Sequence, residues 1–423
     1  MKGSYHGKAC RDTRHLSRFF ATHGQLFLPF LDLIEQSSSM IGEVLEQVNG
    51  AFIEGLLELS AMQVAGPPHQ GRGGGPIRRH GHQRGRVMLS DRQLRVRRPR
   101  LRRREGAEVS IPVYDALQDD RKFQERVEAL MMRGVSTRDY ATVISELAET
   151  AGVSKSNVSR EFIESSARSL ETLTARRWDE VDLLVIYLDG IRFGDHHVLA
   201  ALGVDSEGRK HVLGLVEGAS ENAEATVRLL EDLVERGVDS QQKYLFVIDG
   251  SKALRSAIRR VFGSRQKVQR CRLHKIRNVR RELPDELADQ VVAVMKAAFR
   301  LEPKEGKVKL EQQAKWLATE YPGAAASLRE GIDELFTVND LGLPPSLFRC
   351  LTTTNIIESP FGTLQKPMRR VTRWRDGQMV TRWAASSFLT AEKKFRRIMG
   401  YSDLWMLEVA LERKEVNSEG KAA

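Results

Sequence analysis

The segment from residue 181 to residue 272 restricts the fold more than any other part of the chain. It contains five short apolar runs, at residues 183–188, 197–204, 211–216, 244–248 and 267–272. Continuous runs of this length are typical of strands that are buried on both faces. Amphipathic helical patterns separate the third run from the fourth and the fourth from the fifth. The resulting order, β-β-β-α-β-α-β, is a three-strand meander followed by crossovers. It predicts a ribonuclease H-like α/β core.

Carboxylates directly follow two of these runs. Asp189 follows the first run and Asp249 follows the fourth. In open α/β sheets, functional groups gather at the carboxyl ends of strands. Each aspartate also has a purely structural interpretation. Asp189-Gly190 is a frequent hairpin-turn dipeptide, and Asp249-Gly250-Ser251 suits the start of a helix.

Glu358 is the third candidate carboxylate. It lies in the stretch Thr352–Ser359, and Pro360 requires any helix to begin close to this point. Asn355 with Glu358 three residues later also fits a capping box, which is the structural alternative. Mg²⁺ prefers oxygen ligands, and a pair of such ions can activate the attacking oxygen of a phosphodiester and stabilise the leaving one. The sequence therefore predicts an Mg²⁺ (or Mn²⁺) site at Asp189, Asp249 and Glu358.

The positive charge is concentrated in one segment. The net charge is +11, and residues 70–104 alone contain 13 Arg, no Lys and one acidic residue. Such a confined excess predicts a polyanionic partner, with nucleic acid as the first candidate. Apolar residues alternate around residues 87–96, which predicts a β-hairpin with arginines on its open face. The candidate DNA-binding side chains here are Arg95, Arg97, Arg98, Arg100 and Arg102. A solvated charge run is the alternative.

Residues 120–176 show helical periodicity and resemble a helix-turn-helix. An apolar stripe from Tyr140 to Leu147 precedes the turn at residues 151–153, and Ser154 can cap the second helix. Lys155, Asn157 and Arg160 would then face the major groove. Two ordinary packed helices are the alternative. A further basic segment contains Arg369, Arg370 and Arg373 beside two tryptophans. Arginines beside aromatic residues suit contact with DNA. The alternative is a solvated helix whose tryptophans belong to the core.

Several stretches together resemble one known family. They are Tyr187–Gly190, Val247–Gly250, Cys271–Lys275, Thr353–Ser359 and Glu392–Ile398. The chain resembles Mutator-type bacterial insertion-sequence transposases with a DDE catalytic triad. The resemblance implies a ribonuclease H-like catalytic domain, a divalent metal, and DNA strand cleavage and transfer. It assigns the acidic roles to Asp189, Asp249 and Glu358, and it makes Cys271 and His274 part of the catalytic neighbourhood. A structural zinc site at that pair would need four ligands, usually two such pairs.

The expected organisation follows from these segments. We expect a helical region at 1–65, a Gly/Arg-rich linker and basic hairpin at 66–110, a helix-turn-helix-like DNA-binding domain at 111–176, a ribonuclease H-like core at 177–282 and 350–400, a helical insertion at 283–349 and a tail at 401–423. The N-terminal helical stripe, which begins at Phe27, would serve dimerisation or simply pack within a helical subdomain.

Partners and location follow from the same features. We expect binding to terminal inverted repeats and target DNA, as a homo-oligomer of at least two chains because two DNA ends must be paired. No apolar run approaches the roughly 18 residues that span a bilayer. Three widely spaced cysteines indicate a reducing, intracellular compartment. We expect a cytoplasmic location in association with the nucleoid. The alternatives are a catalytically inactive DNA-binding protein derived from a transposase and a plain ribonuclease H-like nuclease.

Overall fold

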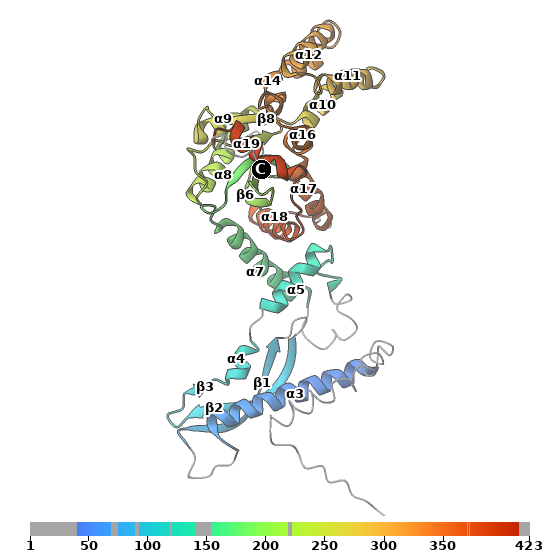
Figure 1. Ribbon diagram of the computed structural model, residues 1–423. Helices are drawn as coiled ribbons and strands as arrows, with labels where there is room; N and C mark the ends of the chain where they lie inside the picture. Colours follow the sequence, from blue (N-terminus) through green and yellow to red (C-terminus); the bar gives the residue numbers. More distant parts are fainter. Residues whose placement is uncertain are drawn as a thin grey trace, which may run out of the picture. The chain divides into compact units, whose positions relative to one another are not determined.

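Figure 1 shows the computed structural model of the chain. It describes residues 40–68, 75–88, 93–118, 121–140, 154–218, 222–369, 371 and 373–413. The chain forms two compact units, and two of the three boundaries between them fall inside helices, α5 (Arg121–Met132) and α7 (Lys155–Thr174). One unit comprises residues 1–127 and 137–159, and the other comprises residues 128–136 and 160–423. The helical stripe expected from Phe27 lies outside the described residues, as do residues 141–153.

A helix packed on a small sheet makes up the described core of the first unit. Helix α3 (Met40–Ala65) precedes strands β1 (Ile77–Met88), β2 (Gln93–Arg103) and β3 (Glu108–Val109), and the short helix α4 (Pro112–Ala116) follows. The strands form an antiparallel sheet in the order β1-β2-β3. Apolar residues of α3 pack on one face of the sheet: Ile53, Leu57 and Ala61 against Val87, Leu94, Val96 and Leu101.

The hairpin is present and is longer than expected. Its first strand begins at Ile77, so residues 77–85, whose composition suggested a linker, belong to β1. Its second strand alternates buried Leu94 and Val96 with exposed Arg95 and Arg97. This alternation places an arginine-bearing face opposite the face that packs on α3.

A five-stranded mixed sheet forms the centre of the second unit. Strands β4 (Leu183–Phe193), β5 (His196–Asp205) and β6 (Lys210–Glu217) form an antiparallel meander, and β7 (Leu245–Ile248) and β8 (Lys267–Arg270) run parallel to β4. The strand order is β6-β5-β4-β7-β8. Helix α8 (Ala223–Glu235) connects β6 to β7, and α9 (Lys252–Phe262) connects β7 to β8. The predicted order of strands and helices is therefore confirmed.

Helices cover both faces of this sheet. On one face, α8 and α9 share a core with alternate strand residues, among them Leu188 and Ile248. Helices α17 (Asn355–Met368) and α18 (Gly377–Glu392) contact β4, β5 and β6. Tyr187, which follows the opposite alternation to Leu188, donates a hydrogen bond from its hydroxyl to the Cys350 carbonyl, 3.1 Å away. Burial on both sides explains why residues 183–189 are all buried.

A helical insertion separates β8 from α17. It follows α10 (Arg272–Arg281) and consists of α11 (Asp285–Ala298), α12 (Pro303–Leu317), α13 (Pro322–Arg329), α14 (Ile332–Leu335), α15 (Thr337–Asp340) and α16 (Pro345–Leu351). A separate apolar core joins α10 to α14 through residues such as Val279, Leu310 and Phe336. Figure 1 shows α11 and α12 projecting away from the sheet of this unit. The last described elements of the unit are η4 (Tyr401–Asp403) and α19 (Leu404–Ala410). Among the described residues, no helix is long and apolar enough to span a bilayer.

Candidate active site

Asp189 and Asp249 lie side by side at the edge where β7 ends. Strands β4 and β7 are parallel neighbours, and their last paired residues are Leu188 and Ile248. The two aspartates come directly after that pair. Asp189 is not in a hairpin turn, because β4 continues to Phe193 while paired with β5. The structural role expected for Asp249 is present, since its Oδ1 accepts the backbone N–H of Ser251 at 2.8 Å.

Glu358 reaches this edge from the first turn of α17. The helix begins after Thr354, whose carbonyl accepts the backbone N–H groups of Ile357 and Glu358. The Glu358 carboxylate accepts the Thr354 hydroxyl at 2.8 Å. The Thr354 N–H donates to the sulfur of Cys271 at 3.4 Å. The carboxylate is therefore not engaged in the capping box that pairs Asn355 with Glu358, and it is 26% exposed.

Cys271 and His274 lie beneath Glu358, at the junction of β8 and α10. Cys271 caps α10, and its sulfur accepts the His274 N–H at 3.5 Å. The Thr354 hydroxyl is 3.3 Å from the Cys271 sulfur and 3.2 Å from Nδ1 of His274. Nδ1 of His274 is in turn 3.8 Å from Oε1 of Glu358.

These three side chains form a cluster that could in principle bind a metal. One ligand atom each from Cys271, His274 and Glu358 lies within 4.8 Å of the other two. However, the Thr354 hydroxyl is already within hydrogen-bond distance of all three, at 2.8–3.3 Å. A zinc ion would need ligand atoms at about 2.0–2.3 Å in that space. The geometry favours a hydrogen-bonded network over a zinc site.

Electrostatics connect this network to the aspartates. The pKa of Asp189 is raised to about 7, chiefly by burial. The charges of Asp249 and Glu358 act in the same direction, and His274 acts against them. The pKa of His274 is raised to about 9, first by its hydrogen bond with Cys271. At neutral pH a positively charged imidazole therefore faces the carboxyl groups of Glu358 and Asp189, whose charges also raise its pKa.

Cys271 is the hydrogen-bond partner that raises the pKa of that imidazole most. Burial raises the pKa of its thiol, but hydrogen bonds from His274 and Thr354 outweigh burial and hold the pKa below its usual value. Cys271 is fully buried. The network therefore favours the charged form of the imidazole, whose Nδ1 lies 3.8 Å from the Glu358 carboxylate.

Arg277 was not among the residues predicted from the sequence. Its Nη1 is 3.6 Å from Oε2 of Glu358, and its side chain is 59% exposed. The sequence did contain a sign of a basic surface here, because residues 250–281 contain twelve Lys and Arg and no Asp or Glu. This second basic segment does not stand out in the net charge of the chain, because acidic residues elsewhere offset it. Arg277 also lies one helical turn after His274 on α10, so the two share a face.

The candidate DNA-binding arginines of β2 have different surroundings. Arg95 and Arg97 are exposed. The guanidinium of Arg98 lies 3.9 Å from the centre of the Tyr114 ring. Arg100 and Arg102 both pair with Glu108, at 2.5 and 3.8 Å. Arg95 and Arg97 are therefore the most exposed members of this group.

The structure describes only part of the expected helix-turn-helix. Ser154 caps α7 as predicted, since its hydroxyl accepts the Asn157 N–H at 3.2 Å. Lys155 and Arg160 are exposed, and the expected buried positions, Val158 and Phe162, are buried. The first helix and the turn fall within residues 141–153, outside the described residues.

The basic segment after Glu358 is also described in part. Arg369 and Arg373 are exposed, and Arg370 lies outside the described residues. Trp383 is buried and packs 4.5 Å from Phe162 and 6.1 Å from Trp374, between ring centroids. The core interpretation therefore holds for Trp383.

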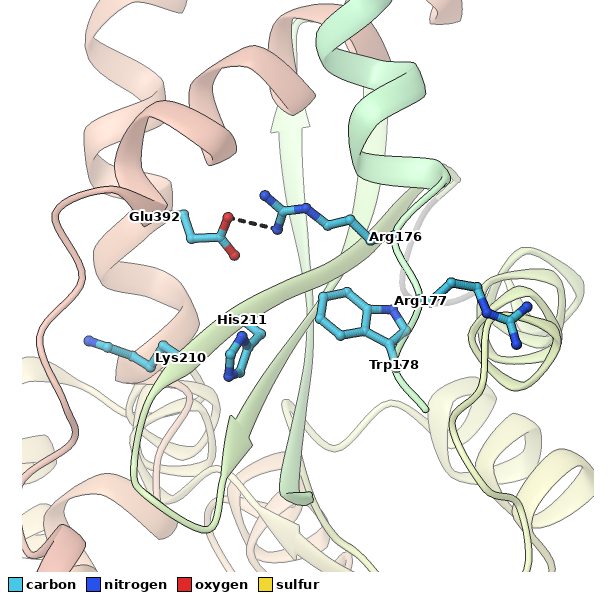
Figure 2. Close-up of a pocket in the computed structure, with 6 residues that line it drawn as sticks. All are labelled: Arg176, Arg177, Trp178, Lys210, His211 and Glu392. Carbon is cyan, nitrogen blue, oxygen red and sulfur yellow. Dashed lines mark ion pairs between the residues drawn. The ribbon is translucent and has the colours of Figure 1, made fainter. Parts of the chain in front are cut away.

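A cavity of about 370 Å³ lies at the other end of the sheet. It is lined by Arg176, Arg177, Trp178, Lys210, His211 and Glu392 (Figure 2). Lys210 begins β6, near the start of β4 and thus far along the strand from Asp189. Glu392 pairs with Arg176 at 2.7 Å and accepts the Val212 N–H at 2.7 Å. These contacts attach Glu392 of α18 to β6, away from the end of the sheet that carries Asp189.

Comparison with known proteins places the chain among transposases. The family described as "Transposase, Mutator family" matches residues 27–382. The transposase of insertion sequence IS6120 from Mycolicibacterium smegmatis is 28% identical over 251 residues, which cover 57% of this chain and 76% of that protein. The transposase of IS905 from Lactococcus lactis is 30% identical over 288 residues, which cover 65% of this chain and 68% of that protein. The transposase of IS256 in Tn4001 from Staphylococcus aureus is 26% identical over 265 residues, which cover 56% of this chain and 63% of that protein. The chain belongs to the Mutator family of transposases.

Proposed function

We propose that this transposase cleaves and joins DNA strands at a centre formed by Asp189, Asp249 and Glu358 in a ribonuclease H-like core. The observation that carries the proposal is the position of the two aspartates, which end the paired part of neighbouring parallel strands. Glu358 lies close enough to raise the pKa of Asp189 together with Asp249. Three carboxyl groups from distant parts of the chain thus meet at one edge of the sheet.

The donor set fits divalent metal ions. Carboxylate oxygens are the ligands that Mg²⁺ and Mn²⁺ prefer. The crowding of the three carboxyl groups contributes to the raised pKa of Asp189, after burial, and a bound cation would relieve this repulsion. We propose that Asp189, Asp249 and Glu358 hold such ions. When bound, the ions would supply Lewis-acid stabilisation of the attacking and leaving oxygens.

The neighbouring side chains would orient the reacting groups. The Thr354 hydroxyl holds Glu358, and His274 presents a positive imidazole beside the same carboxylate. We propose that this imidazolium and the exposed Arg277 guanidinium hold the scissile phosphate against the carboxylates. Cys271, fully buried under His274, stabilises the charged form of the imidazole.

DNA binding would involve both units. Arginines contact phosphates and set affinity without reading sequence. We propose that the β1–β2 hairpin, through Arg95, Arg97, Arg98, Arg100 and Arg102, and the start of α7, through Lys155, Asn157 and Arg160, hold the terminal inverted repeats. Arg369, Arg370 and Arg373 would guide the cleaved end or the target.

We propose a homo-oligomer of at least two chains, because two element ends must be paired. Helix α3 offers one candidate surface. Phe52, Leu59 and Met62 are 63%, 48% and 43% exposed, while Ile53, Leu57 and Ala61 face the hairpin. The spacing of the exposed residues matches heptad positions.

Incubation of the protein with duplexes that carry cloned element ends tests the proposal. We expect Mg²⁺-dependent nicking at the 3′ end of the element, abolished by EDTA. Binding to the ends without nicking in Mg²⁺ or Mn²⁺ would support an inactive DNA-binding relative instead. Equal cutting of unrelated duplexes would support a plain nuclease.

A further inference from the structure

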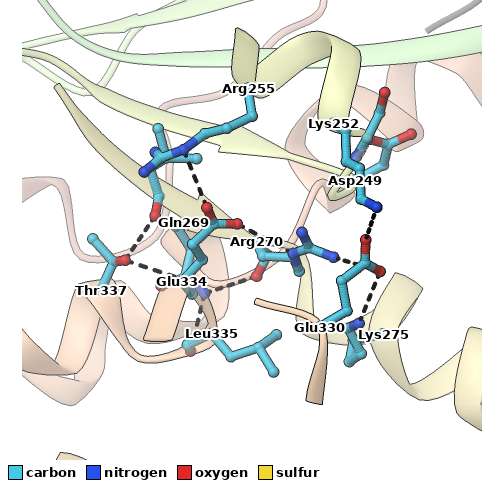
Figure 3. Close-up of polar contacts among 12 residues, drawn as sticks. Asp249, Lys252, Arg255, Gln269, Arg270, Lys275, Glu330, Glu334, Leu335 and Thr337 are labelled. Carbon is cyan, nitrogen blue, oxygen red and sulfur yellow. Dashed lines mark hydrogen bonds and ion pairs between the residues drawn. The ribbon is translucent and has the colours of Figure 1, made fainter. Parts of the chain in front are cut away.

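Arg270, the last residue of β8, is buried between the five-stranded sheet and the helical insertion. Its side chain is 8% exposed and lies between Glu334 and Glu330 (Figure 3). Its Nε is 3.2 Å from Oε2 of Glu334, and its Nη1 is 3.2 Å from Oε2 of Glu330. Both glutamates belong to the insertion, and Glu334 is 64 residues further along the chain. A buried guanidinium is tolerated only when its donors are paired, and here the insertion supplies the partners.

The same guanidinium packs against the turn that follows Asp249. A Cβ atom at Gly250 would lie 2.8 Å from Nη1 and 2.9 Å from Cζ of Arg270. Only glycine leaves room for this approach, and Gly250 also has a φ of +104°, which other residues rarely adopt. Gly331, with a φ of +70°, approaches from the insertion, where a Cβ would lie 2.5 Å from Nε. Arg270 thus contacts the Asp249–Gly250 turn and the insertion at the same time.

The residues around Arg270 hold the insertion in the same way. Gln269 accepts the Val338 N–H at 3.0 Å and donates to the Leu335 carbonyl at 3.1 Å. Arg272 donates to the Leu335 carbonyl at 2.9 Å. Cys271 and His274, which contact Thr354 and Glu358, belong to the same stretch of six residues. One short segment therefore holds the insertion with some side chains and the candidate site with the others.

We propose that Arg270 is a positioning residue, which places Asp249 by locking the turn at Gly250 to Glu330 and Glu334 of the insertion. The consequence for metal binding rests on the proposed function. A metal site requires its ligands to be held within about 0.5 Å of their productive positions. Lysine cannot replace the arginine, because the planar guanidinium presents donors on two edges and lies flat against Gly250. The position of the insertion is thereby transmitted to a carboxylate of the candidate site.

Hydrogen–deuterium exchange on the full chain tests the coupling without requiring activity. In Arg270→Lys we expect severalfold faster exchange at residues 249–252 and 330–336 together, with strand β5 unchanged. Glu330→Gln combined with Glu334→Gln changes only the insertion side and should accelerate exchange at residues 249–252 as well. Arg259→Lys is the matched control. Arg259 lies on the exposed face of α9 and lines, together with Arg270, a cavity of about 480 Å³. Faster exchange confined to residues 330–336, or spread over the whole sheet, would show that Arg270 is only a structural ion-pair residue.

Mn²⁺ binding followed by electron paramagnetic resonance provides the second readout. Residues that orient metal ligands typically change affinity 10–100-fold when they are altered. We expect Arg270→Lys to weaken Mn²⁺ binding about tenfold and Arg259→Lys to leave it unchanged. Unchanged affinity in Arg270→Lys would overturn the positioning role. If the unaltered protein binds no Mn²⁺, the metal site of the proposed function fails, and the exchange result alone decides the role of Arg270.

Discussion

The hydroxyl of Thr354 connects three side chains of the candidate site, Cys271 and His274 of one segment and Glu358 of another. It lies 2.8 Å from Oε1 of Glu358, 3.2 Å from Nδ1 of His274 and 3.3 Å from the sulfur of Cys271. The residues themselves could be singled out from sequence, because acidic, cysteine and histidine side chains carry recognisable chemistry. The role of the threonine could not, because 83 residues separate it from Cys271 and only the folded chain brings the two together.

Thr354→Val should separate the role of this hydroxyl from its volume. Valine has nearly the same shape but cannot donate to Glu358, so we expect cleavage to fall by about 10–100-fold. Loss of the hydrogen bond should lower the free energy of unfolding by only about 1–2 kcal/mol. Thr354→Ser keeps the donor and should retain most activity. Cleavage rates and urea unfolding of both variants check this, and a fully active valine variant would remove Thr354 from the site.

The protonation of Asp189 should make the metal requirement depend on pH. Its pKa is raised to about 7, so a growing fraction carries a proton as the pH falls below 7. A proton and a divalent ion compete for the same carboxylate. We expect the Mg²⁺ concentration for half-maximal cleavage to rise by up to about tenfold per pH unit below 7. A requirement for Mg²⁺ that is constant between pH 6 and pH 8 would contradict this.

In the metal-free protein, the free energy of unfolding should also depend on the protonation of Asp189. The folded-state pKa of Asp189 lies above its ordinary value of 3.8, so the folded state binds more protons in this range. The contribution of Asp189 to stability should therefore fall as pH rises from about 4 to 7. His274, with a pKa raised to about 9, acts in a separate window and loses its contribution between about pH 6.5 and 9. In urea unfolding, Asp189→Asn should lack the loss of stability between about pH 4 and 7 and keep the loss between about pH 6.5 and 9.

The strands of the five-stranded sheet could be predicted because their burial is nearly complete. Runs such as 183–188 have apolar residues on both faces, and helices cover both faces of the sheet in the structure. The ends of the strands were less predictable. Strand β4 runs on through Asp189 to Phe193 because β5 continues to pair with it after β7 has ended. A turn dipeptide within a paired strand cannot be distinguished by composition from one in a real turn.

The first part of strand β1, residues 77–85, was missed for a related reason. Its residues are rich in Gly, His and Arg, which is typical of a linker. In the structure its pairing with β2 shifts between Arg79 and His82, and Gly81 has a φ of +73° within this irregularity. Glycine at such a position accommodates an extra residue in the strand. The hairpin is stabilised by its packing on α3 and by contacts such as Arg79 with Glu58, which are 21 residues apart.

The arginines of the hairpin should differ in their effect on DNA binding. Each phosphate contact contributes about −0.9 to the slope of log affinity against log salt concentration. Replacing Arg95 and Arg97 together by alanine should make that slope about 2 units less steep. Arg100→Ala is the control, because Arg100 already pairs with Glu108 and should change the slope less. Salt titrations of end binding measure the difference, and equal slopes for all variants would mean that this face does not contact DNA.

Two basic segments divide the positive charge of the molecule between its two units. Residues 70–104 belong to the first unit and residues 250–281 to the second. The second segment includes α9 and α10, which adjoin Asp249 and Glu358. This division agrees with the proposal that both units contact DNA. The helical insertion is connected to the same centre through Arg270, a contact that the sequence alone could not show.

Cleavage of element ends by four matched variants tests whether the three carboxylates form the catalytic centre. The variants are Asp189→Asn, Asp249→Asn, Glu358→Gln and the control Asp195→Asn, which removes an exposed carboxylate from the turn after β4. Each substitution is nearly isosteric, and Glu358→Gln keeps a group that can accept the Thr354 hydroxyl. Loss of metal-ion stabilisation of several kcal/mol corresponds to a rate reduction of about a hundredfold or more.

We expect the first three variants to bind element ends normally and to lose Mg²⁺-dependent 3′-end nicking by about a hundredfold or more, while Asp195→Asn cleaves like the unaltered protein. Near-normal nicking by any of the first three, with folding intact, would remove that residue from the centre and contradict the account.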